Sequence, residues 1–387
     1  MSGVQVRYRY RAYPTAGQQQ MLTRTFGCAR AVFNDALRLR DQLRATGERL
    51  SDSQIQTRVI TDAKHTPERE WLNEVASVAL VQACQDARRA YRNWFDSMSG
   101  VRKGRRVGKP RFRKKSNRQS IRLTRNGFSV RKDGRVYLAK IGDVRVRWSR
   151  ELPSEPSSVT VIREPDGRYY LSFVAEREKQ TLPAIDHATG IDLGLDRLVV
   201  TSDGEIVANP RFLRKRLRKL AYLQRAASRK QKGSANRRKA NKRVAIAHRK
   251  VRDARLDHAH KTALRLIRDN QTVYAEDLAV SGLARTRLAK SVHDAGWSQL
   301  LRLIGEKADY HGRTFHQIGR FVPSSQICSA CGRLDGPKPL SVRSWECPCG
   351  AVHDRDVNAA KNILAVGQAE RLNASGAHVS PATQAVA

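Results

Sequence analysis

Four of the six cysteines lie between positions 328 and 349. They form two pairs, Cys328-Ser-Ala-Cys331 and Cys347-Pro-Cys349, separated by fifteen residues and followed by Gly332 and Gly350. Two thiolate pairs at this separation suit the tetrahedral coordination of Zn²⁺. The second pair is CxC in place of the usual CxxC, which could strain the site, recruit His353 or be an accepted variant. We predict one structural zinc ion and assign it no catalysis.

Acidic residues stand at positions where strands or helices could present them to a common edge. Asp192 lies inside a strand-like segment, Glu276 ends an apolar run, and Asp354 and Asp356 precede a helical segment. An acid inside a strand is costly unless it is paired or binds a metal. Hard cations such as Mg²⁺ bind carboxylates, and a pair of them can flank an in-line phosphoryl displacement. Each acid alone is ambiguous, since Asp356 could simply favour its helix N-terminus; together they suggest a metal-dependent nuclease.

The charge of the chain identifies the class of partner. Its 387 residues include 74 Lys and Arg against 36 Asp and Glu, a net charge of +38. Such an excess calls for a polyanion, first nucleic acid and second an acidic membrane surface. With 40% hydrophobic residues the chain can build cores. No stretch approaches the ~18 apolar residues of a membrane span, and the first residues lack the apolar core of a signal peptide, so we expect a cytoplasmic, nucleoid-associated protein.

Two segments concentrate the positive charge. Residues 211–252 contain eighteen Lys or Arg and no acid, with helical spacing of leucines on either side of a break at Gly233-Ser234. Residues 101–118 are rich in cations, Gly and Pro. Ordinary charged surfaces mix signs, so phosphate contact explains these segments better. We predict nucleic-acid contacts at Arg111, Arg113, Lys114, Lys115, Arg214, Lys215, Arg218, Lys219, Arg237, Arg238, Lys239, Lys242 and Arg243.

The periodicity of the first half predicts a β domain with a helical insertion. Val4–Tyr10 alternates as a strand, whereas residues 14–100 carry apolar residues at helical spacing, including a segment from Trp71 to Phe95. The buried thiols Cys28 and Cys84 are expected on these helices. Short strand-like runs then follow, with hairpin signals at Asn126-Gly127, Asp133-Gly134 and Asp166-Gly167.

The second half alternates strands and helices. Strands are expected at 191–195, 198–201, 206–207, 272–276 and 314–318, with a hairpin at Asp203-Gly204. Helices are expected at 211–252 as a basic hairpin, at 257–269 and around 297–310. This order is that of an α/β unit.

Four segments in order, GIDLGLDRLVVTSDG, AEDLAVSGL, CSAC…CPCG and HDRDVNAAKNIL, resemble the TnpB (OrfB) family. Insertion sequences encode this family, which is related to the type V CRISPR effector nucleases. The first, second and last segments resemble the three split motifs of a RuvC-like nuclease domain, with the zinc ribbon before the third. FGCARAVFNDAL and KPRFRKKSNRQSIRL extend the resemblance over most of the chain.

The resemblance implies a multidomain α+β protein. An RNase H-like (RuvC) α/β nuclease domain with an inserted zinc ribbon would follow a small antiparallel β-barrel-like domain that carries a helical bundle. The corresponding bounds are 1–13 plus 105–180 for the β (wedge-like) domain, 14–104 for the helical recognition domain, 185–322 plus 353–368 for the nuclease domain, 323–352 for the ribbon and 369–387 for a disordered tail.

The family's functional residues transfer onto matching positions. The catalytic carboxylates, which would hold two Mg²⁺ ions, fall on Asp192, Glu276 and Asp356, and the zinc ligands on Cys328, Cys331, Cys347 and Cys349. The exclusion of Asp277 and Asp354 depends on the motif match alone. The partners implied are a guide RNA derived from the transposon end and target double-stranded DNA beside a short protein-read motif.

Three other functions fit parts of the pattern. A transposase would join DNA ends with the same acids and metals, so residue chemistry does not separate it from a guided nuclease. A nuclease-dead, RNA-guided repressor would bind without cutting, but the complete acid triad opposes it. A ribosome-associated protein or RNA chaperone explains the charge and the ribbon, but not three carboxylate motifs. The oligomeric state is left open.

Overall fold

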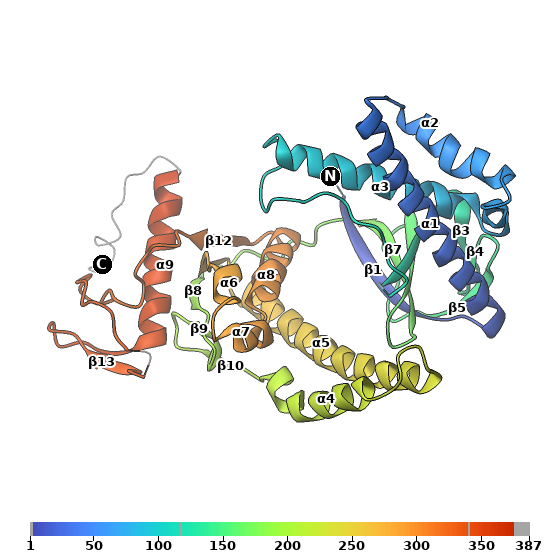
Figure 1. Ribbon diagram of the computed structural model, residues 1–387. Coiled ribbons are helices and arrows are strands. Elements are labelled where there is room, and N and C mark those ends of the chain that lie inside the picture. The colour runs from blue at the N-terminus through green and yellow to red at the C-terminus, as the bar shows by residue number, and fades with distance from the viewer. Residues whose placement is uncertain (1–2, 117, 340, 375–387) are drawn as a thin grey trace. The chain divides into compact units, whose positions relative to one another are not determined.

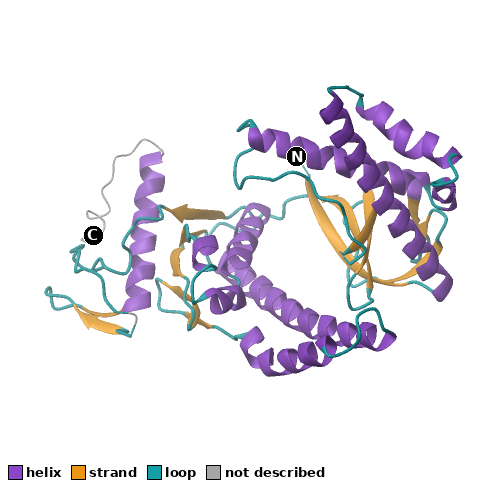
Figure 2. Cartoon of the chain, in the orientation of Figure 1, coloured by secondary structure: helices purple, strands orange, loops and turns teal. Residues whose placement is uncertain are grey.

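The computed structural model describes residues 3–116, 118–339 and 341–374. The chain forms two compact units, residues 1–178 and residues 179–387. Figure 1 labels the helices and many of the strands of both units, and Figure 2 colours the chain by secondary structure. No described helix combines the length and the apolar character that crossing a membrane requires.

A seven-stranded antiparallel sheet organises the first unit, in the order β2-β6-β7-β1-β5-β4-β3. Its edge strands β2 and β3 are consecutive in the chain and joined only by a 3-10 helix, Arg125–Gly127. The sheet therefore curls into a nearly closed form, which is the barrel-like domain expected. The strands are β1 (Val4–Tyr13), β2 (Gln119–Thr124), β3 (Phe128–Val130), β4 (Val136–Leu138), β5 (Gly142–Arg147), β6 (Ser158–Arg163) and β7 (Tyr169–Arg177).

Helices fill the interval between β1 and β2, so they are an insertion into the sheet. Helix α1 begins with a capping box between Thr15 and Gln18 and ends at Gly47. Cys28 and Cys84 lie in the core that these helices share with the sheet, and both thiols are buried as expected. The segments are α1 (Ala16–Thr46), α2 (Asp52–Gln56), a π-helix (Thr57–Asp62), 3-10 helices (Ala63–His65 and Glu70–Glu74) and α3 (Ser77–Met98).

Two expectations for this unit were wrong in detail. The helix expected from Trp71 begins only at Ser77, because residues 70–74 form a 3-10 helix. The hairpin expected at Asn126-Gly127 does not form, since β2 pairs with β6 and β3 with β4. A Cβ on Gly127 would lie 2.6 Å from Cγ1 of Val78, so this glycine allows close packing against α3. The signals at Asp133-Gly134 and Asp166-Gly167 are confirmed as antiparallel hairpins.

A five-stranded sheet organises the second unit, in the order β10-β9-β8-β11-β12. The pairs of β8 with β11 and of β11 with β12 are parallel, whereas β9 and β10 continue the sheet antiparallel. The carboxyl ends of β8, β11 and β12 consequently lie at one edge. The strands are β8 (Ala188–Asp192), β9 (Arg197–Thr201), β10 (Ile206–Ala208), β11 (Thr272–Glu276) and β12 (Thr314–Ile318), with β13 (Ser344–Glu346) and β14 (Val352–Asp354) pairing in a separate hairpin.

The helices of this unit differ from expectation in two places. The helix expected at 257–269 is the end of the continuous 35-residue α5, which contains no Gly or Pro to break it. The tail expected from residue 369 begins too early, because α9 continues to Ala374; residues 375–387 lie outside the described part. The helices are α4 (Phe212–Ser228), α5 (Ala235–Asp269), α6 (Val280–Leu283), α7 (Ala289–Ala295), α8 (Trp297–His311) and α9 (Arg355–Ala374).

Helix α9 packs unusually close to strand β8. A Cβ on Gly190 would lie 2.1 Å from the carbonyl oxygen of Ala360 and 2.6 Å from the amide nitrogen of Leu364. These are backbone atoms, which cannot yield as a side chain can, so only glycine permits this approach. The contact fixes α9 against the sheet.

Candidate active site and metal centre

Asp192 and Glu276 end two neighbouring parallel strands at the same level. Ile191 of β8 pairs with Ala275 of β11, so the next residue of each strand is the acid. Side chains alternate between the faces of a sheet, and both acids therefore point to the face opposite to Ile191 and Ala275, about 5 Å apart along the hydrogen-bonding direction. The parallel register thus brings two carboxylates together that are far apart in the sequence.

Helix α9 adds Asp356 to this pair. Gly190 and Asp192 share one face of β8, and Gly190 contacts α9 at Ala360 and Leu364. Asp356 lies one helical turn before Ala360, toward the edge where Asp192 ends its strand. The close packing at Gly190 therefore positions the third acid. Figure 1 shows α9 beside the sheet that contains β8.

The charges of the three acids act on one another. The pKa of Asp192 is raised from its ordinary 3.8 to about 7, first by burial and then by the negative charges of Glu276 and Asp356. Burial also raises the pKa of Glu276, whose Oε1 accepts a hydrogen bond from Oγ of the buried Ser324. Such mutual repulsion among carboxylates is relieved by a proton or a bound cation.

The structure separates the roles of Asp354 and Asp356. Oδ1 of Asp354 accepts hydrogen bonds from the backbone N–H groups of Asp356 (3.0 Å) and Val357 (3.1 Å), so Asp354 caps α9. Burial would raise the pKa of Asp354, but hydrogen bonds from Arg197 and Val357 outweigh it and lower the pKa. The Asp356 side chain, 14% exposed, lies 3.7 Å from Arg197 and 3.5 Å from Arg343. The capping task thus falls to Asp354 and leaves Asp356 available for the site.

Asp277 also takes a different role from its neighbour Glu276. Its carboxylate forms an ion pair with Arg320 at 2.6 Å, and both side chains are about half exposed. Asp277 is therefore occupied outside the cluster that Asp192, Glu276 and Asp356 form.

Sequence reasoning missed the residues that support Glu276. Asn362 of α9 donates hydrogen bonds to the carbonyl oxygens of Ser324 and Ile327, both at 2.7 Å, and Asn358 donates to Ile327 at 2.7 Å. Both asparagines are buried, and Ser324 in turn contacts Glu276. Two amides four residues apart on the otherwise apolar stretch VNAAKNIL were the available signal.

The four predicted cysteines form a cluster. The Sγ atoms of Cys328, Cys331, Cys347 and Cys349 all lie within 4.8 Å of one another. Cys328 and Cys347 are buried, whereas Cys331 and Cys349 are exposed. Four thiol sulfurs drawn together from two turns match the donor set that a tetrahedral metal ion requires. The cluster can therefore hold one metal ion without a fifth ligand.

His353 lies beside this cluster. Its Nε2 atom is 3.1 Å from Sγ of Cys328, and its ring packs 4.8 Å from that of Trp345 across the β13–β14 pair. Since four sulfurs already converge, the CxC spacing does not oblige the histidine to replace a cysteine. Its position suits a hydrogen bond that orients a ligand sulfur.

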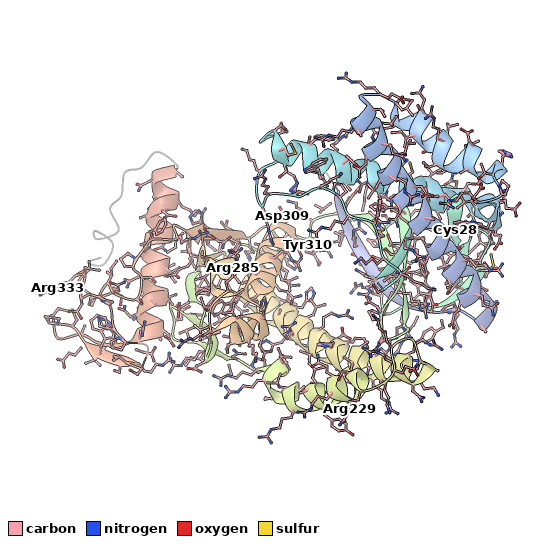
Figure 3. All side chains as sticks on the ribbon, in the orientation of Figure 1. Cys28, Arg229, Arg285, Asp309, Tyr310 and Arg333 are labelled. Atoms are coloured by element: carbon pink, nitrogen blue, oxygen red, sulfur yellow. The ribbon has the colours of Figure 1, made fainter. Side chains whose placement is uncertain are left out.

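The predicted nucleic-acid contacts are mostly exposed, with two exceptions. Arg113 pairs with Asp86 at 3.1 Å and lies 3.8 Å from the ring centre of Phe33, and Arg237 donates to the carbonyl oxygen of Lys230 at 2.8 Å. These two arginines are engaged within the protein. The exposed ones are Arg111, Lys114, Lys115, Arg214, Lys215, Arg218, Lys219, Arg238, Lys239, Lys242 and Arg243. Figure 3 labels Arg229, near the end of α4 in the basic α4–α5 hairpin.

Comparison with known proteins identifies the family. The OrfB model described as "Probable transposase" matches residues 172–287, "Cas12f1-like, TNB domain" matches 297–363, and an OrfB "Helix-turn-helix domain" matches 1–49. A Streptomyces pristinaespiralis protein named "Putative RNA-guided DNA endonuclease" is 43% identical over 95% of this chain and 91% of its own length. The chain belongs to the TnpB (OrfB) family. The expected resemblance is thereby confirmed.

Other TnpB relatives and one solved structure agree. An Escherichia coli K12 protein named "Putative RNA-guided DNA endonuclease InsQ" is 29% identical over 94% of this chain and 92% of its own length. The structure of a Cas12f1-sgRNA-target DNA complex contains a similar chain, with a TM-score of 0.58, 12% identity and coverage of 93% of this chain and 98% of that one. The mixed helix-and-sheet fold is therefore Cas12f1-like.

Replacing Asp192 by Asn should stabilise the metal-free protein increasingly as the pH rises. The raised pKa of Asp192 means that the folded state retains a proton that the unfolded state has lost. The stability of the folded state that depends on a protonated Asp192 is fully present below the ordinary pKa of 3.8. It is lost as the pH rises through the folded-state pKa of about 7. Thermal unfolding in EDTA should give a gain in Tm of several degrees by about pH 8, and little gain near pH 4.

The control is Asp277→Asn, which removes an exposed, paired carboxylate and should show no such trend. A Tm difference between Asp192→Asn and the unmodified protein that stays constant with pH would contradict the assigned electrostatics.

Metal analysis should separate cysteine ligands from His353. We expect one zinc per chain, lost in Cys328→Ser and Cys347→Ser but retained in His353→Ala, with affinity lower by about 10- to 100-fold. Stoichiometry from elemental analysis and affinity from chelator competition measure this. Cys84→Ser, a buried thiol outside the cluster, is the control. Zinc lost in His353→Ala at saturating metal would make the histidine a ligand.

Proposed function

We propose that this protein is an RNA-guided, metal-dependent DNA endonuclease associated with a transposable element, with a RuvC-like nuclease domain. The convergence of Asp192, Glu276 and Asp356 at one sheet edge carries the proposal. The names of its relatives support it, as does the order of β8 to β12, in which three strands form a hairpin meander and two further strands add in parallel.

The donor set fits Mg²⁺ in its chemistry, because carboxylate oxygens are the protein ligands that this ion prefers and water and phosphate oxygens would complete its coordination. When bound, such ions would activate water and stabilise the leaving oxygen of an in-line displacement. The chain's own residues prepare this chemistry. Asp192, whose pKa is raised, would hold such an ion in its ionised form. Ser324 orients Glu276, and the Asp354 cap fixes the first turn of α9, from which Asp356 projects.

The four-cysteine cluster is proposed as a structural zinc site. The cluster joins the segment after Ser324 to the start of α9. It therefore holds together the two segments that flank the ribbon, one carrying Ser324 and the other Asp356. The ribbon of residues 323–352 thus supports the nuclease domain without entering the reaction.

The exposed cations of the α4–α5 hairpin and of residues 101–118 are proposed to hold the guide RNA and its duplex with target DNA. Contacts with phosphates are sequence-independent, so base pairing would supply the specificity. We also propose the domain bounds that the family resemblance implies, except for those of the tail.

Two substitutions on adjacent acids test the site. Asp356→Asn should lower RNA-dependent DNA cleavage on the order of a thousandfold or more, because the charge that holds the metal is lost. Asp354→Asn should retain most activity, because Asn caps a helix as well as Asp does. Single-turnover cleavage by protein purified with its RNA measures both.

Glu276→Ala should lose cleavage as Asp356→Asn does. Its control is Asp277→Ala, which removes the neighbouring acid outside the site and should leave cleavage normal. Cleavage that survives in Asp356→Asn, or that is lost equally in Asp354→Asn, would overturn the assignment of the third acid. Strand joining in place of RNA-dependent cleavage would favour a transposase.

Neutralising the hairpin should flatten the salt dependence of RNA binding. Four exposed cations changed to Gln should reduce the slope of log affinity against log salt by about 3; the four are Arg218, Lys219, Lys239 and Lys242. A control of equal charge loss changes exposed cations outside both basic segments, namely Arg49, Arg58, Lys132 and Arg135. Equal slopes for the two variants would show that the hairpin has no special role.

A further inference from the structure

An exposed phenylalanine lies in the turn that follows β12. The side chain of Phe321 is 94% exposed, more than any other large hydrophobic residue in the described part of the chain. Single exposed hydrophobic residues are common, but most keep contact with their own surface. Phe321 leaves almost its entire ring in solvent and forgoes the gain from burial.

The turn around Phe321 is held in place by its other residues. The amide of Val322 donates to the carbonyl oxygen of Gly319 at 3.3 Å, which places Arg320 and Phe321 at the two corners. Arg320 is tied to Asp277, and Val322 packs against the apolar cluster beneath the sheet edge. The backbone is therefore fixed, and the exposure of Phe321 does not come from a loose segment.

The turn lies next to the three carboxylates. Ile318, at its start, pairs with Glu276 across the parallel strands. Ser324, at its end, donates a hydrogen bond to the carboxylate of Glu276. Phe321 is midway in the sequence between these two contacts with Glu276, so it lies in the turn at the same sheet edge as the acids.

The surroundings of Phe321 are polar and include a half-exposed arginine. The neighbouring Arg320 side chain is 49% exposed. It also lines a cavity of about 620 Å³, together with Gln317, Ser298 and the ion pair of Arg302 with Glu306. An aromatic ring beside a cation is the combination that binds single-stranded nucleic acid, with the ring stacking on a base and the cation near a phosphate.

We propose that Phe321 stacks on a nucleobase of the single-stranded DNA segment that enters the carboxylate site, and so sets the position of the phosphodiester to be cut. Stacked bases of a duplex offer no free face, so the partner is a single strand or a strand end. Because every base has such a face, the contact tolerates any sequence. This inference rests on the proposed function and adds a substrate-positioning residue outside the acid triad.

Substitutions at Phe321 test for an aromatic contact. Phe321→Ala should lower kcat/KM for a single-stranded DNA substrate on the order of tenfold, mainly through KM, whereas Phe321→Trp should retain the activity and Phe321→Leu should not. The slope of log affinity against log salt should stay unchanged in all three, because stacking releases no counterions. Leu334→Ala, which alters a hydrophobic residue of the ribbon that is 62% exposed, is the matched control.

A second measurement does not depend on cleavage. Single-stranded DNA carrying 2-aminopurine is added to the full-length Asp192→Asn protein, and base stacking is followed by fluorescence quenching. Quenching at one position along the strand that is lost in Phe321→Ala and restored in Phe321→Trp supports the inference. Quenching or kcat/KM that is the same in Phe321→Ala as in the parent protein overturns it, as does an equal loss in Phe321→Trp. If the unmodified protein, purified with its RNA, cuts no DNA, the proposed function fails, while the quenching in the Asp192→Asn background still decides the stacking contact.

Discussion

The repulsion among three carboxylates at one sheet edge is the constraint around which the second unit is arranged. Asp192 and Glu276 are adjacent because β8 and β11 run parallel in register, and Asp356 joins them because α9 packs directly on Gly190. The raised pKa of Asp192 reflects the unfavourable free energy of ionising this buried carboxyl beside two other acids. A protein keeps such a cluster when a cation outside the chain relieves it.

The neighbouring charges are placed to limit that cost without cancelling it. Arg197 binds the capping acid Asp354 at 2.8 Å and stays 3.7 Å from Asp356, while Arg343 binds Asp196 at 2.7 Å and stays 3.5 Å from Asp356. Each arginine thus has a closer partner than Asp356. The third acid is oriented by cations but not neutralised by them.

The cysteine cluster and the acid cluster are mechanically connected through α9. Asn358 and Asn362 bind the backbone at Ser324 and Ile327, immediately before the first cysteine pair. The second pair leads through β14 into the Asp354 cap. Folding of the ribbon and placement of Ser324 and Asp356 are therefore coupled, which connects the four-cysteine cluster to the positions of the carboxylates.

The sequence by itself determined the cysteine set, the candidate acids, the basic hairpin and most strands, because these depend on residue type, spacing and local periodicity. It also gave the family. The motif match preferred Asp356 to Asp354, but only the tertiary structure gave the physical reason, which is that Asp354 caps α9. Only the tertiary structure found Ser324 beside Glu276 and showed that Arg113 and Arg237 have partners within the protein. It also replaced the Asn126-Gly127 hairpin by a link between two sheet edges. The physical reason is common to these cases: each depends on contacts between residues distant in the chain, and local sequence carries no record of which distant group a side chain meets.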